Sequence, residues 1–107
     1  MTIYIKNKEE KIWYTMIILL ENYSIVDLVL IMSVEPGKGG QEFIVETSNK
    51  IKEVRALLDA YNSKAVINID GGVNDKSRSL CDGVDIVTSG SYIVRSDDFQ
   101  EKIDSLR

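Results

Sequence analysis

The sequence predicts an α/β protein in which four strand–helix units form a parallel sheet. Short apolar segments alternate along the chain with stretches whose apolar residues recur every three or four positions. Polar, glycine-rich stretches come directly after three of the apolar segments, which is where α/β proteins hold ligands. A chain of 107 residues can bury one modest core, so we expect a single domain over residues 1–107.

The first strand–helix unit is expected near the start of the chain. Ile3 and Ile5 alternate with polar neighbours, which indicates a short strand. Asn7 followed by Glu10 is typical of a capped helix start. A helix is expected after Asn7, because Trp13, Ile17 and Leu20 then fall on one face. A strand over residues 14–20 is the alternative.

The second unit surrounds the most distinctive loop of the chain. Residues 26–34 are almost wholly apolar, which is typical of a parallel strand covered on both faces. After a glycine-rich loop, a helix is expected to end at Asn62 and Ser63. Its apolar residues recur at three- and four-residue intervals: Ile51, Val54, Leu58 and Tyr61.

The last two units complete the predicted sheet. Residues 65–69 form the third strand and place Asp70 at its end, and a short helix over residues 74–81 is expected to stop at Gly83. Residues 85–88 form the fourth strand. Asp97 is expected to cap a last helix with these residues facing inward: Phe99, Ile103 and Leu106. The carboxyl ends of all four strands then meet at one edge.

Composition excludes several classes of protein. The net charge is −4 and charges of both signs are interspersed, so no basic surface indicates nucleic acid or an anionic membrane. The longest apolar runs are too short for a membrane span, and no signal peptide is recognisable. Cys81 is the single cysteine, which excludes an internal disulfide and favours a cytoplasmic location. With no histidine, a histidine-based metal site or proton relay is excluded.

The loop over residues 32–41 is a candidate anion site. It reads Met-Ser-Val-Glu-Pro-Gly-Lys-Gly-Gly-Gln and lies between a predicted buried strand and a predicted helix. Glycines around Lys38 let backbone N–H groups approach an anion closely, and phosphate is the natural ligand. A plain tight turn between strand and helix is the alternative.

Three motifs together resemble those of the ribulose-phosphate 3-epimerase family. They are the loop over residues 32–41, then Asp-Gly-Gly-Val at 70–73, then Ser-Gly-Ser-Tyr-Ile at 89–93 followed by Arg-Ser-Asp-Asp. Each motif alone is weak, but their order and spacing form a specific signature. The resemblance implies a TIM-type (β/α)8 barrel, which typically takes about 250 residues. The chain is thus expected to be half of such a barrel, beginning near the fifth strand.

The resemblance also implies a reaction. The family converts D-ribulose 5-phosphate to D-xylulose 5-phosphate in the pentose phosphate pathway, by removing the C3 proton to give a metal-held enediolate. The matching residue Asp70 is implied as a metal ligand and as one of two acid–base carboxylates, its alternative being an aspartate that caps a turn. Met32 resembles a pocket methionine that lies against the enediolate, its alternative being ordinary core packing.

Phosphate binding is implied for residues of three loops: Gly39, Gly40, Gly71, Gly72, Gly90 and Ser91. Lys38 departs from the family, which more often has phenylalanine there. Its side chain either contacts the phosphate or extends into solvent, and solvent is favoured. Ser33 and Glu35 are expected to be structural.

The metal implied by the resemblance is divalent: zinc, iron or manganese. The family's other ligands, two histidines and an aspartate, belong to strands that precede this chain, and nothing here replaces them. We therefore expect the chain alone to be inactive. The alternatives are a non-catalytic phosphosugar-binding or assembly module, or one subunit of a split barrel. A homodimer that closes an eight-stranded barrel is expected, or else pairing with a missing N-terminal half.

Overall fold

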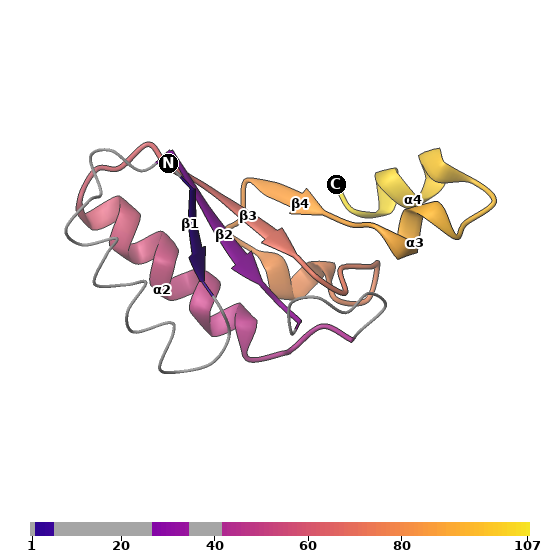
Figure 1. Cartoon of the computed structure of the whole chain (residues 1–107), viewed down its shortest axis with the longest axis horizontal. Helices are drawn as coiled ribbons and strands as arrows, with labels where there is room; N and C mark the ends of the chain where they lie inside the picture. Colours follow the sequence, from indigo (N-terminus) through magenta and orange to yellow (C-terminus); the bar gives the residue numbers. More distant parts are fainter. Residues whose placement is uncertain (1, 6–26, 35–41) are drawn as a thin grey trace.

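A computed structural model describes residues 2–5, 27–34 and 42–107 of the chain. The strands are β1 (Thr2–Ile5), β2 (Leu28–Met32), β3 (Val66–Asp70) and β4 (Ile86–Thr88). They form one parallel sheet in the order β1-β2-β3-β4, so each strand pairs with its neighbour in sequence (Figure 1). This confirms the predicted α/β class and is consistent with part of a TIM-type barrel. The expected helix after Asn7 and the loop residues Glu35, Lys38, Gly39 and Gly40 lie outside the described residues.

The helices follow the strands in alternation. They are α2 (Thr47–Ala60), the 3₁₀ helix η1 (Arg78–Cys81), α3 (Ser91–Val94) and α4 (Phe99–Ser105). Ile51, Val54 and Leu58 are at most 1% exposed, as their spacing predicts, and they form the core with the buried side chains of β2 and β3. Those side chains are Val29, Ile31, Ile67 and Ile69.

The end of α2 agrees with the expectation from Asn62 and Ser63. Asn62 has a φ of 52°, the left-handed conformation that asparagine tolerates better than most residues. Its N–H donates to the carbonyl of Asp59 at 3.1 Å, and the N–H of Ser63 donates to that of Leu58 at 2.9 Å. These two bonds form a Schellman motif, which ends the helix and turns the chain toward β3.

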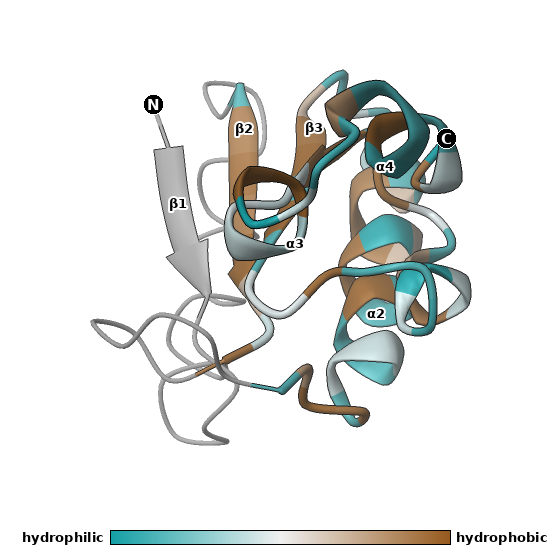
Figure 2. Ribbon diagram, turned by 90° about the vertical axis from the view of Figure 1, so that its right-hand side faces the viewer, coloured by the Kyte–Doolittle hydropathy of each residue, from teal (hydrophilic) through white to brown (hydrophobic). Residues whose placement is uncertain are grey.

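The two faces of the sheet differ in burial. Along β2 and β3, fully buried residues alternate with half-buried ones. The buried set faces α2, which lies with α4 on one side of β2 and β3 (Figure 2). The half-buried residues lie on the other face: Leu28, Leu30 and Met32 on β2, and Val66, Asn68 and Asp70 on β3. Met32 and Asp70 are at the carboxyl edge of the sheet. In a closed barrel this second face lines the interior.

Two sequence expectations about the C-terminal units are wrong, and a third is confirmed in part. Asp98, not Asp97, is the N-cap of α4, because its carboxylate accepts from the N–H of Glu101 at 3.1 Å. Phe99 is 56% exposed, because α4 has only two turns and the contacts that it makes with Tyr92 of α3 come from Lys102 and Ser105, near its end. The short helix expected over residues 74–81 is confirmed only over its second half, as the 3₁₀ helix η1, which a turn precedes. Gly83, expected to stop it, follows it with a φ of 100°.

No helix within the described ranges has the length and apolar character needed to cross a bilayer.

Candidate functional site

Polar side chains gather at the carboxyl edge of the sheet. The strand register places Met32, Asp70 and Thr88 next to one another on three adjacent strands. Asn68 lies two residues before Asp70 on β3 and therefore on the same face of the sheet. Its Oδ1 accepts a hydrogen bond from the Thr88 hydroxyl at 2.9 Å. Within the described part of the chain, no side chain or N–H group donates to the Asp70 carboxylate, so this group is available to a ligand.

Ser33 fixes the backbone on which Asp70 is carried. Its side chain is fully buried directly after β2. Its N–H donates to the Asp70 carbonyl at 2.9 Å, and its hydroxyl lies within hydrogen-bonding distance of the carbonyl oxygens of Asp70, at 3.1 Å, and Gly71. The interpretation of Ser33 as a structural residue agrees with these contacts.

Gly71 allows the turn that follows Asp70. Its φ of 124° is one that side chains with a Cβ rarely adopt. A Cβ at this position would lie 2.5 Å from Cγ2 of Val34, which is buried beside it. Packing against Val34 therefore requires a glycine at the first glycine position of the Asp-Gly-Gly motif, whether or not that glycine also contacts a ligand.

The loop after β3 is held by Asn74 and Ser77. The Asn74 Oδ1 accepts from the N–H groups of Lys76 and Ser77, both at 2.9 Å. The Ser77 hydroxyl donates to the carbonyl of Gly72 at 3.0 Å. These bonds give the Gly72 segment a defined position without a regular helix, because the turn takes its geometry from side chains.

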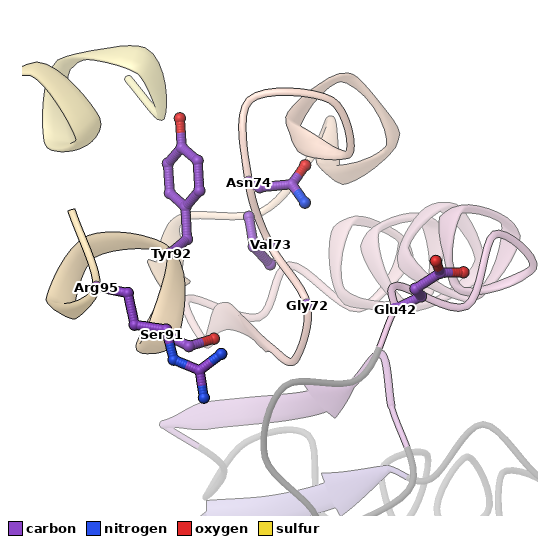
Figure 3. A pocket seen from close by; sticks show the side chains of 7 residues that line it. All are labelled: Glu42, Gly72, Val73, Asn74, Ser91, Tyr92 and Arg95. Atoms are coloured by element: carbon purple, nitrogen blue, oxygen red, sulfur yellow. The ribbon is translucent and has the colours of Figure 1, made fainter.

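A hydrogen bond links the loop after β3 to the loop after β4. The Ser89 hydroxyl donates to the carbonyl of Val73 at 2.9 Å. Between these loops lies a cavity of about 320 Å³ (Figure 3). It is lined by residues of the loop after β3, of α3 and its C-cap, and of the segment before α2: Glu42, Gly72, Val73, Asn74, Ser91, Tyr92 and Arg95.

The structure brings some of the predicted site residues together and separates others. Gly72 and Ser91 line the cavity, whereas Gly71 and Gly90 lie next to them in the chain. Met32 and Asp70 lie on the strand ends and not among the cavity residues.

Sequence reasoning did not single out Arg95, Asn74 or Thr88. Arg95 stands in the Arg-Ser-Asp-Asp motif, and that match is the signal that could have marked it.

The described residues do not fit the divalent metal that the family resemblance implies. Within residues 27–34 and 42–107, no point gathers three carboxylate or thiol side chains. Asp70 is one hard oxygen ligand, and the whole chain has no histidine to join it. A protein site for zinc, iron or manganese normally needs at least three protein ligands, so this donor set is insufficient.

Two ionisable groups outside the edge serve the fold. The Asp85 carboxylate accepts from the N–H of Ile67 at 2.8 Å and pairs with Arg55 at 2.6 Å. Partial burial raises the pKa of Asp85, but the Ile67 bond and the Arg55 guanidinium outweigh burial, so the pKa lies below its ordinary value of 3.8. Burial raises the pKa of the Cys81 thiol to about 11, which keeps it protonated and unreactive.

The fold and the edge define an α/β protein of the barrel type, with its polar residues at the carboxyl ends of parallel strands. The ribulose-phosphate 3-epimerase family model matches residues 14–94, and the chain belongs to that family.

Ribulose-phosphate 3-epimerases of three species illustrate the similarity. The protein of Helicobacter pylori is 45% identical over 101 residues, which cover 92% of this chain and 43% of that protein. The protein of Mycobacterium tuberculosis is 41% identical over 76% of this chain and 36% of its own length. That of Escherichia coli is 38% identical over 77% of this chain and 37% of its own length. The chain thus spans less than half the length of these relatives.

Proposed function

We propose that the chain carries the phosphate-binding part of a ribulose-phosphate 3-epimerase site and binds a pentose phosphate such as D-ribulose 5-phosphate. One observation carries the proposal, namely that Gly72, in the loop after β3, and Ser91, at the start of α3, line a single cavity. Backbone N–H groups from neighbouring strand ends can converge on one phosphate where side chains are small. By family resemblance, Gly39, Gly40, Gly71 and Gly90 complete this set.

Asp70 is proposed as the group that exchanges the C3 proton of the sugar. Its place at the end of β3, with an unengaged carboxylate, supports this role because a general base must reach the proton it removes. Met32, next to Asp70 in the strand register, is proposed to pack against the planar enediolate. The cavity would then hold the phosphate of the ligand, and the Asp70 carboxylate would face the sugar carbons.

The 107-residue chain by itself is proposed to bind this ligand without turning it over. Epimerisation needs an acid–base group on each face of the sugar and stabilisation of the charge on the enediolate, and one carboxylate cannot supply all three. The insufficient donor set for a metal supports this view. The remaining groups are proposed to come from a missing N-terminal half of the barrel or from a second copy.

Assembly is the second candidate function, favoured by the half-buried face of the sheet. Ile86 on β4 is 41% exposed, and the register places it in one row with Asn68 and Leu30. A second copy, or a separate N-terminal half, is proposed to cover this face and close a barrel. A cytoplasmic location is proposed as well, since the single cysteine is suited to a reducing compartment.

Turnover and binding of D-ribulose 5-phosphate by the purified chain test the proposal. Calorimetry should show binding, whereas D-xylulose 5-phosphate should not form with zinc, iron(II) or manganese supplied. Turnover that disappears in Asp70→Asn but persists in Asp75→Asn, an exposed aspartate of the next loop, would show that the chain assembles a working site. Absence of binding would refute the phosphate-binding role.

A further inference from the structure

We propose that Arg95 contacts the phosphate of the bound phosphomonoester and supplies a positive side chain to this site. The inference rests on the proposed phosphosugar-binding function. Arg95 is the C-cap of α3, four residues after Ser91, so both lie on the same side of this helical turn. Both line the cavity, and the Arg95 side chain extends along Ser91 toward it (Figure 3).

The guanidinium group of Arg95 is available to a ligand. The chain has four arginines. Arg55 pairs with Asp85 at 2.6 Å, Arg78 donates to the carbonyl of Leu106 at 2.7 Å, and Arg107 lies 3.6 Å from Asp104. The Arg95 side chain, by contrast, has neither an ion pair nor a hydrogen bond with any residue that the structure describes. Its fork of N–H donors matches the oxygens of a phosphate.

Asn74 offers a second donor from the opposite loop. Because its Oδ1 accepts two backbone N–H groups at 2.9 Å each, the orientation of the amide is determined. Its Nδ2 group is therefore left to donate elsewhere, and Asn74 lines the cavity. Tyr92 offers no such donor, because its hydroxyl is bonded to the hydroxyl of Ser105 at 2.8 Å.

Charge explains why a side-chain cation is useful here. The chain has a net charge of −4, and Glu42 lines the far side of the cavity (Figure 3). An adjoining hollow that Arg95 also borders has three carboxylates, Asp97, Asp98 and Glu101, against one further cation, Lys102. These carboxylates repel an anion, and one guanidinium next to Ser91 offsets this repulsion at the point where a phosphate would lie.

The test is titration of the ¹⁵N-labelled chain with inorganic phosphate, and then with D-ribulose 5-phosphate, followed by NMR. We expect the amide signals of Gly72 and Ser91 and the Nε signal of Arg95 to shift together. Arg95→Gln should weaken phosphate binding about tenfold, as loss of a charge-assisted hydrogen bond does, and Arg95→Lys should lie between it and the wild type. Arg107→Gln, which removes an equal charge at the exposed chain end, should bind like the wild type.

The outcomes separate the two proposals. Phosphate-dependent shifts at Gly72 and Ser91, with equal affinity in the wild type and Arg95→Gln, would overturn the role of Arg95 and leave the phosphate site standing. Equal losses in Arg95→Gln and Arg107→Gln would reduce the effect to overall charge and overturn it as well. If phosphate shifts neither amide in the wild type, the proposed function fails together with the inference.

Discussion

Ser33 donates its backbone N–H to the carbonyl oxygen of Asp70 at 2.9 Å, and its hydroxyl lies 3.1 Å from the same oxygen. A residue after one strand thereby determines where the next strand ends. The candidate acid–base carboxylate is carried on backbone that is tied to a neighbouring loop.

Ser33→Ala should destabilise the fold by about 1–2 kcal/mol, because the carbonyl groups of Asp70 and Gly71 lose the fully buried Ser33 hydroxyl as a donor. Urea unfolding followed by circular dichroism measures this change. Ser79→Ala on η1, where the side chain is exposed, serves as the control and should be close to neutral. Equal midpoints for Ser33→Ala and the wild type would contradict the structural role.

Gly71→Ala should cost at least about 2–3 kcal/mol, since the new Cβ meets Val34 at 2.5 Å and the backbone conformation disfavours it. Gly90→Ala is the matched comparison, because a Cβ there has no described atom within 4 Å. Thermal unfolding of both variants measures the contrast. Similar melting temperatures would mean that the turn after Asp70 can rearrange.

Asp85 should make stability depend on pH in the acid range. Its folded-state pKa is lowered, so its contribution is present above the ordinary value of 3.8 and is lost as the pH falls through the lower folded-state value. With the side chain 42% exposed, the contribution at neutral pH is at most about 1 kcal/mol after solvent screening.

Urea unfolding at a series of pH values measures the effect of Asp85→Asn. The variant should be less stable than the wild type at pH 7, and the difference should shrink below about pH 4. Arg55→Gln removes the charged partner and should weaken the same dependence. Parallel pH curves for the wild type and Asp85→Asn would be the contrary result.

Ile86→Lys should abolish self-association if a second copy covers the half-buried face of the sheet. Ile86 is 41% exposed on β4, and a lysine buried in such an interface would lose hydration of its charge. Sedimentation equilibrium measures the mass, with Val45→Lys, at a 61% exposed position before α2, as the control. A wild-type chain that sediments as a monomer would rule out closure by two copies.

Glu42→Gln should strengthen phosphate binding about twofold, because it removes a carboxylate from the far side of the cavity. Glu53→Gln on α2 changes the net charge equally, but its position lies outside the cavity lining, so it should have a smaller effect. Phosphate titrations of the two variants give the comparison. A larger gain in Glu53→Gln would place the anion elsewhere.

The alternation of strands and helices could be predicted because each element has a local signal. Ile51, Val54 and Leu58 recur at the helical period, and Asn62 marks the end of that helix with a residue suited to its backbone. The choice between Asp97 and Asp98 as a cap has no such signal. Both are aspartates before the same helix, and the extended backbone at Asp98 decides between them.

The candidate site could be predicted only where a motif carried it. Asp70 and the glycines follow strands directly, so their edge of the sheet follows from the order of elements. The partners of Ser33 lie 37 and 38 residues away, and the neighbourhood of Arg95 depends on a four-residue helix too short for periodicity. Contacts of this kind come from strand register and loop packing, which a local pattern does not determine.

The strand order has a consequence for how the chain folds. Every strand pairs with its neighbour in sequence, and the shortest separation between paired residues, 18 positions from Asn68 to Ile86, joins β3 to β4. Closing a short loop costs less entropy than closing a long one, and Leu28 pairs with Val66 only across 38 positions. The β3–β4 pair is therefore expected to form first and the β1–β2 pair, separated by 26 positions between Thr2 and Leu28, next. The pairing of β2 with β3, which closes the longest loop, then joins the two halves of the sheet.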